Sequence, residues 1–182
     1  MRVITGTARG RKLKTLEGMD VRPTTDMVKE AVFSIVQFQV PCASVLDVFA
    51  GSGQMGIEAL SRGAARAVFV DNSRASQAVI RENLAATGLA KQARVIADDA
   101  VSFLAHAADR YDIIFLDPPY DAGFAPQVLP LLERVLAPGG IVLFEHRLKE
   151  ELPAEAGGLV LKKNYRYGKI AVTTYIHAED AQ

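Results

Sequence analysis

The chain has 182 residues, of which 49% are hydrophobic and 23% charged; this indicates one globular domain of ordinary size and excludes wholesale disorder. No apolar run approaches the roughly 20 residues that cross a bilayer, and the first residues lack the apolar stretch of a signal peptide, so we expect a cytoplasmic protein with no membrane partner. The single cysteine, Cys42, excludes an internal disulfide, and three scattered histidines, His106, His146 and His177, argue against a bound metal.

Charge is balanced over the chain but uneven along it. There are 21 basic and 21 acidic side chains, which by itself argues against a nucleic-acid partner. Before the first acid, Glu17, however, stand five basic residues: Arg2, Arg9, Arg11, Lys12 and Lys14. Such a local excess is typical of a surface that binds phosphate backbones, and it is equally consistent with a solvated basic end.

In chain order, the pattern begins with a weakly alternating, glycine-containing stretch over 1–21, which predicts a small β-extension. A helix follows over 22–36, with Thr25 or Asp26 as its cap. Short β-rich runs then alternate with amphipathic helical patterns, which is typical of a parallel sheet covered on both faces. We predict strands at 44–49, 66–71, 93–97, 111–117, 140–145, 159–167 and 169–177, and helices at 53–63, 73–88, 100–107 and 125–140. Only Gly168 separates the last two strands, so we expect an antiparallel hairpin there.

The loop after the first of these strands holds Gly51, Gly53 and Gly56 in the spacing G-x-G-x-x-G, which is usually assigned to dinucleotides. Asp47, just upstream, conflicts with that assignment. A carboxylate in a poorly screened crevice repels a diphosphate and favours a ligand that carries positive charge. S-adenosylmethionine, which has an ammonium and a sulfonium group, is such a ligand, and we favour it over NAD.

Acids also end the next two strands. Asp71 follows the second strand, where a carboxylate accepts hydrogen bonds from ribose hydroxyls, which suits NAD and S-adenosylmethionine equally. Asp98 and Asp99 follow the third strand, where either one is placed to accept from an adenine amino group. Each acid taken alone is as well explained as a helix cap or a loop residue; three in succession at the ligand edge favour a binding site.

The fourth strand runs into Asp117-Pro118-Pro119-Tyr120, where the two prolines end the strand and stiffen the turn. A nucleobase amine is a poor nucleophile because its lone pair is delocalised into the ring. Two acceptors on its N–H bonds, here Asp117 and the Pro118 carbonyl, orient the amine and stabilise the charge that develops as a methyl group arrives. Tyr120 is placed to stack on a base swung out of its helix or loop.

These motifs resemble those of class I methyltransferases: "DVFAGSGQMG" at 47–56, "VFVDNS" at 68–73, "ADDA" at 97–100 and "DPPY" at 117–120. Together with "RVITGTARGRKL", "RPTTDMVKEAVFSIV" and "YGKIAVTTY", the chain resembles the RsmD family, the bacterial small-subunit rRNA guanine-N2 methyltransferases. The resemblance implies a Rossmann-like α/β fold with a mostly parallel seven-stranded sheet, an antiparallel last strand and helices on both faces. It implies two parts, an RNA-contacting β-hairpin extension over 1–21 and a methyltransferase domain over 22–182.

Family roles transfer onto this sequence position by position. The methionine part of S-adenosylmethionine would contact Asp47, Phe49, Gly51 and Gly53. The ribose would contact Asp71 and Asn72, and the adenine would contact Asp99 and Ala100. Thr24 would lie near the entrance of the cofactor site. The catalytic residues would be Asp117, Pro118, Pro119 and Tyr120, and the RNA contacts Arg2, Arg9, Arg11, Lys12 and Arg22. The implied substrate is a guanine of 16S rRNA, at position 966 by the family's activity, in an assembled or assembling small subunit, and we expect the enzyme to act as a monomer.

Other activities remain open at this stage. An adenine-N6 methyltransferase of DNA or RNA is the nearest alternative, because the Asp117 motif does not distinguish one exocyclic amine from another. A protein glutamine-amide methyltransferase usually has Asn at that position, and a nucleotide-binding assembly factor would not need the intact motif. Cytosine-C5 methylation requires a nucleophilic cysteine at the same turn, whereas Cys42 precedes the first strand of the sheet and is expected to be a small buried residue.

Overall fold

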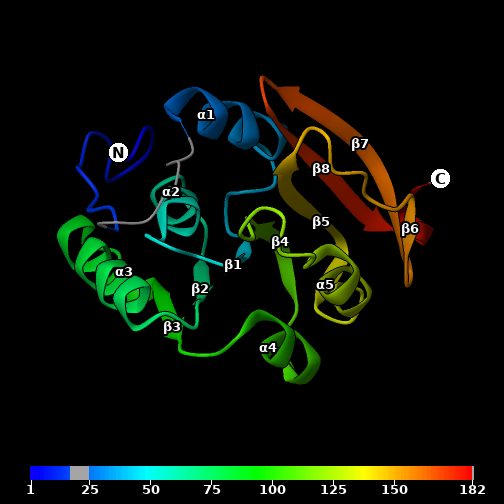
Figure 1. Cartoon of the computed structure of the whole chain (residues 1–182). Coiled ribbons are helices and arrows are strands. Elements are labelled where there is room, and N and C mark those ends of the chain that lie inside the picture. The colour runs from blue at the N-terminus through cyan, green and yellow to red at the C-terminus, as the bar shows by residue number, and fades with distance from the viewer. Residues whose placement is uncertain (17–24, 182) are drawn as a thin grey trace.

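The β-rich runs of the sequence assemble into one mixed sheet of eight strands in the order β3-β2-β1-β4-β5-β8-β7-β6 (Figure 1). The computed structural model describes residues 1–16 and 25–181. The strands are β1 (Ser44–Val48), β2 (Arg66–Val70), β3 (Ala93–Ile96), β4 (Tyr111–Leu116), β5 (Leu136–Arg147), β6 (Glu155–Ala156), β7 (Leu159–Tyr167) and β8 (Ile170–His177). The helices are α1 (Asp26–Ile35), α2 (Gln54–Ser61), α3 (Arg74–Thr87), α4 (Ala100–His106) and α5 (Ala125–Leu132), with 3-10 turns at Ala90–Gln92 and Ala178–Ala181.

The first five strands are parallel, and β8, β7 and β6 continue the sheet in antiparallel fashion. Helices cover both faces: α1, α2 and α3 pack on one, α4 and α5 on the other. Neighbouring strand residues such as Val45 and Leu46 enter opposite cores because side chains alternate along a strand. The predicted Rossmann-like fold is therefore confirmed, with one additional two-residue strand, β6.

The prediction of a helix over 125–140 is wrong at its carboxyl end. α5 ends at Leu132, and the chain joins the sheet at Leu136, which pairs with Tyr111 of β4. A register irregularity then separates this pair from Ile141 and Ile113. The apolar spacing after Leu132 suits a helix as well as a strand, and pairing with a distant strand decides between them.

The first 16 residues lie against the body of the molecule. They carry an isolated antiparallel bridge between Arg2 and Lys12, and they bury Val3, Ala8 and Leu13 in the core that contains α1, α2 and α3. Whether residues 1–21 act as a separate RNA-binding unit stays a prediction. Among the described residues, no helix is both long and apolar enough to span a bilayer.

Cys42 departs from its expected burial. It is exposed in the turn before β1, with a positive φ of 63° and its backbone N–H bonded to the Gly63 carbonyl. That bond joins the turn to the end of α2, so the backbone, and not the thiol, has the structural role here.

Candidate active site

The sheet reverses its winding between β1 and β4, which lie side by side at its centre (Figure 1). In open α/β sheets, ligands bind beyond the carboxyl ends of the strands at such a switch point. The parallel register pairs Asp47 of β1 with Phe115 of β4, so Asp117 lies two residues further along on the same face. The two acids singled out by sequence are therefore brought to one edge.

The glycine loop is shaped by backbone conformations that glycine allows. Gly51 and Gly53 have φ values of 58° and 78°, and Gly53 precedes the first turn of α2. A Cβ added to Gly51 would meet nothing within 4 Å, so the loop leaves open space at that residue. At Gly56, by contrast, a Cβ would lie 2.3 Å from the Phe69 ring, which means that this glycine serves the packing of α2 on β2.

Asp47 supports the loop from beneath. Only 3% of its surface is exposed, and its Oδ2 accepts a hydrogen bond of 2.9 Å from the Gly56 N–H. Burial raises the pKa of the Asp47 carboxyl to about 7, with a smaller contribution from the charge of Asp71, while the Gly56 bond acts in the opposite direction. A cation next to Asp47 would restore its ionisation.

Asp71, directly after β2, binds the backbone of the glycine loop. Its carboxylate accepts from the backbone N–H groups of Gly51 and Ser73, both at 2.9 Å. Each carboxylate oxygen has a second lone pair, so these bonds leave acceptor capacity for hydroxyl groups. Asn72, next to it, is exposed.

Asp98 and Asp99 take local structural roles after β3. Asp99 caps α4 by accepting from the Ser102 N–H at 2.9 Å, and Asp98 accepts from the Asp99 N–H at 2.9 Å. Ala100, in the first turn of α4, is buried. Both acids stay candidates for the adenine site.

The turn after β4 is fixed through its tyrosine. The Tyr120 hydroxyl donates to Glu145 Oε1 at 2.9 Å, and the Arg147 guanidinium lies 5.3 Å from the centre of the Tyr120 ring. Asp121 in turn pairs with Arg147 at 3.0 Å. Pro118 is buried and Pro119 is exposed. Burial raises the pKa of Asp117 well above its usual range, and the charges of Glu145 and Asp47 add to the effect.

Glu145, Arg147 and Phe124 were missed by the sequence interpretation. Glu145 lies within β5, directly after four buried apolar residues, 141–144, and an acid after an apolar run was a usable signal in the sequence. Phe124 contacts Phe49, whose φ is 59°, with ring centres 4.8 Å apart. This contact joins the loop after β1 to the turn after β4, and no local sequence pattern predicts it.

The residues at this edge fit S-adenosylmethionine. Asp47, Asp117 and Glu145 converge there, and within the described parts of the chain none of them forms an ion pair. Carboxyls held this way favour a ligand that brings positive charge, and the space at Gly51 admits close approach to the loop. The same arrangement disfavours the diphosphate of NAD.

The other predicted residues lie on the first segment or outside the described residues. Arg2 pairs with Asp26 at 3.0 Å, whereas Arg9, Arg11 and Lys12 are exposed on the first segment. Thr24 and Arg22 lie outside the described residues. Over the residues that are described, no group of three potential ligands for a metal ion occurs.

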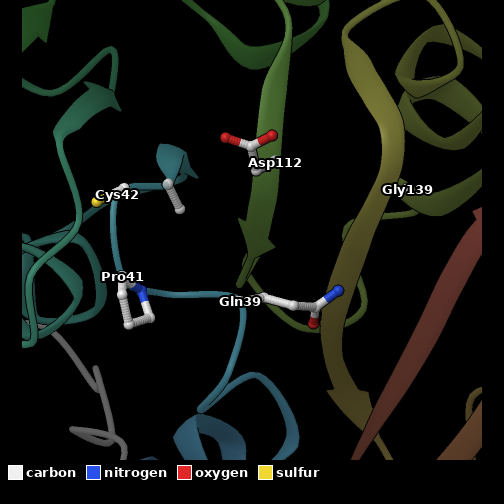
Figure 2. Close-up of a pocket in the computed structure, with 6 residues that line it drawn as sticks. Gln39, Pro41, Cys42, Asp112 and Gly139 are labelled. Carbon is white, nitrogen blue, oxygen red and sulfur yellow. The ribbon is translucent and has the colours of Figure 1, made fainter.

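Two surface hollows lie at the opposite edge of the sheet. One, of about 300 Å³, is lined by Gln39, Pro41, Cys42, Ala43, Asp112 and Gly139 (Figure 2). Asp112 there accepts from the Ser44 N–H at 2.7 Å, which ties β4 to the start of β1. The other hollow adjoins the start of β2 and β3, around Arg66 and Arg94. Neither hollow includes a residue of the candidate active site.

The sheet order, the glycine loop and the acids at the switch point are those of the class I methyltransferases, whose cofactor is S-adenosylmethionine. The family model described as Conserved hypothetical protein 95 matches residues 1–176, and the chain belongs to this family, the RsmD family.

Relatives of similar length support this assignment. Escherichia coli (strain K12) Ribosomal RNA small subunit methyltransferase D is 37% identical over 96% of this chain and 89% of the relative. Bacillus subtilis YlbH is 40% identical over 96% of this chain and 98% of the relative. The solved structure of Escherichia coli yhhF is 37% identical, with 97% of both chains covered and a TM-score of 0.86.

Proposed function

We propose that the protein transfers a methyl group from S-adenosylmethionine to the exocyclic N2 amine of a guanine in small-subunit rRNA. The observation that carries the proposal is the meeting of Asp47 and Asp117 at the switch point, one beside the glycine loop and one on the turn that ends in Tyr120. Relatives named for ribosomal RNA small subunit methylation, matched over nearly the whole chain, support rRNA as the substrate.

The chemistry needs an electrophile and a prepared amine. The cofactor, when bound, supplies an electrophilic methyl group on a positively charged sulfur that leaves as a neutral thioether. Asp117 and the Pro118 carbonyl accept from the two N–H bonds of the amine and direct its lone pair toward that methyl group. As the N–C bond forms, Asp117 or water takes the proton that the amine releases. Tyr120 stacks on the base, with its own ring held by Glu145 and Arg147.

Asp47 and Asp117 are suited to this task because their ionisation responds to the ligand. Burial raises the pKa of both carboxyls, which disfavours their ionised forms. A neighbouring cation lowers both pKa values, because opposite charge favours the ionised form. Asp117 then becomes a full acceptor for the amine when the cofactor site is filled.

Recognition of rRNA is assigned to the basic first segment. Arg9, Arg11 and Lys12 are exposed there, in a chain with no net charge. Shape and bound proteins of an assembled or assembling subunit would supply the remaining specificity. We further propose that the enzyme acts as a monomer in the cytoplasm on 16S rRNA, at the guanine numbered 966.

Nucleoside mapping tests the proposal. Mass spectrometry of rRNA from cells with and without the gene should reveal one N2-methylguanosine that disappears on deletion and returns with the wild-type gene. Loss of an N6-methyladenosine instead would establish the adenine alternative, and an unchanged nucleoside profile would contradict rRNA methylation altogether.

A further inference from the structure

Glu145 lies at the same edge of the sheet as Asp117, and the proposed methyl transfer uses it only to hold the Tyr120 ring. The parallel register pairs Leu116 of β4 with Phe144 of β5, so the next residues, Asp117 and Glu145, follow side by side. Paired strands lie about 4.8 Å apart, and residues in register point to the same face. Glu145 therefore places a second carboxylate next to the one assigned to the amine.

The side chain of Glu145 is held from one side. Its Oε1 accepts from the Tyr120 hydroxyl at 2.9 Å, whereas Oε2 has no hydrogen bond to any described residue. Glu145 is only partly buried, as is Asp117. Arg147, two residues further on β5, lies against the Tyr120 ring and pairs with Asp121, not with Glu145. The Oε2 atom of Glu145 is thus available to accept a hydrogen bond from a substrate.

The bases that carry an exocyclic amine differ in the atom beside it. In guanine the amine lies between two ring nitrogens: N1 bears a hydrogen and donates, whereas N3 carries a lone pair. In adenine and cytosine the corresponding ring nitrogen, N1 or N3, presents a lone pair and accepts. An ionised carboxylate can only accept, so beside the amine it pairs with guanine and opposes the other two bases.

We propose that Glu145 accepts the N1–H of the target guanine, while Asp117 and the Pro118 carbonyl receive its N2 amine, and that Glu145 is thereby the residue that selects guanine. The inference rests on the proposed function, since it concerns the base presented at the same site. Tyr120 has two tasks in this arrangement: its ring stacks on the base, and its hydroxyl orients the Glu145 carboxylate.

The test uses 2-aminopurine, which keeps the amine of guanine but has a lone pair on N1. Small-subunit particles are reconstituted from rRNA with guanine or 2-aminopurine at the mapped nucleotide, and kcat/KM for methyl transfer is measured on both. The wild-type protein should prefer guanine by about 100-fold or more, because a site built to pair with a hydrogen-bonding group rejects an analogue that lacks it. In Glu145→Gln the preference should fall to tenfold or less, roughly, because the amide turns to offer either a donor or an acceptor.

Two further variants separate base selection from support of the fold. Tyr120→Phe keeps the stacking ring and the carboxylate but removes the hydroxyl that orients Glu145. It should therefore lower the rate mainly on the guanine particle and give a preference for guanine between those of the wild type and of Glu145→Gln. Asp109→Asn makes the same acid-to-amide change at the opposite edge of the sheet, where Asp109 pairs with Arg66, and should have the wild-type ratio.

The outcomes distinguish the two proposals. A wild-type protein that does not methylate the guanine particle overturns the proposed function. A wild-type protein that does, combined with a Glu145→Gln variant that keeps the wild-type ratio, overturns the role of Glu145. If Glu145→Gln is inactive on both particles, the ratio is taken from equilibrium binding of the two particles with S-adenosylhomocysteine present, and it is judged in the same way.

Discussion

Asp47 is a carboxyl that the folded protein holds where ionisation is unfavourable. Its pKa moves from 3.8 to about 7, chiefly through burial, with Asp71 as the neighbouring charge. A folded pKa above the unfolded value means that the folded state binds the proton more tightly, so stability is lost as pH rises from about 4 to about 7. The full difference corresponds to about 4 kcal/mol above pH 7. A bound cation offsets this cost, which links stability at this residue to cofactor binding.

Replacing Asp47 by Asn removes the ionisation and keeps an oxygen for the Gly56 N–H. Urea denaturation should show Asp47→Asn more stable than wild type at about pH 8, by up to about 4 kcal/mol, with the difference vanishing near pH 4. Calorimetry should show wild-type affinity for S-adenosylmethionine rising as pH passes through about 7, and in the variant a roughly tenfold weaker affinity that changes less with pH. Equal affinity at all pH values would show that Asp47 does not act on the cofactor's charge.

Asp117 is expected to act mainly on the amine and only weakly on cofactor affinity. Asp117→Ala should reduce methyl transfer to small subunits beyond detection, a loss of more than about 1000-fold, since the amine loses its charged acceptor. Calorimetric affinity for S-adenosylmethionine should fall much less, by about tenfold at most, because Asp47 and Glu145 still favour the positive charge of the cofactor. Asp109→Ala, at the opposite end of β4 from Asp117, serves as the control. A fully active Asp117→Ala protein would refute the assigned role.

Among the elements, those with a clear period were predictable and those that depend on distant partners were not. The runs that became β1 to β4 are apolar, β-rich and bounded by turns, so their type and approximate limits followed from local pattern. The start of β5 did not, because Val135 and Leu136 continue an apolar helical spacing while Leu136 pairs with Tyr111 across the sheet. β6 has two residues and exists through its pairing with Val160 and Leu159.

The helix α2 illustrates how one motif serves two purposes, which a pair of alanine variants separates. Gly56→Ala puts a methyl group against the Phe69 ring and should destabilise the fold by about 2 kcal/mol. Gly51→Ala enters open space, so it should cost only about 1 kcal/mol for its left-handed backbone. Its effect should instead appear as lost affinity for S-adenosylmethionine, measured by calorimetry beside urea denaturation of both proteins. Wild-type affinity in Gly51→Ala would place the cofactor elsewhere.

For the molecule as a whole, the sequence predicted the edge of the sheet at which the candidate site lies better than it predicted which residues make up that site. Asp47, Asp71 and Asp117 each lie at or near the end of a predicted strand, and parallel strands bring their carboxyl ends to one edge. Glu145 meets Tyr120 through the register of β4 and β5 and the course of the turn between them, which are non-local properties. The chemical roles of all these residues remain predictions.

The first segment is held to the body by buried polar groups on α2 and α3. Glu58 accepts from the N–H groups of Ile4 and Thr5 and pairs with Lys29 and Arg62, while Asn83 bonds the backbone of Lys14 and the Ser52 carbonyl of the glycine loop. Buried polar groups bonded on several sides fix their partners in place. The exposed basic side chains therefore lie on a segment whose position is fixed with respect to the glycine loop.

That placement allows RNA binding to be tested without disturbing the cofactor site. Changing Arg9, Arg11 and Lys12 together to Glu should weaken binding to unmethylated small subunits and make the plot of log affinity against log salt shallower by about 2 to 3, as expected when three phosphate contacts are lost. Affinity for S-adenosylmethionine, measured by calorimetry, should not change, because these side chains are exposed and have no part in the hydrogen bonds that hold Asp47 and Asp71 to the glycine loop. Lys91→Glu with Arg94→Glu, beside the hollow at the opposite edge, reverses two charges instead of three and serves as the control, which should retain the wild-type slope. A triple variant with the wild-type slope would mean that the basic segment is a solvated surface and that the rRNA is bound elsewhere.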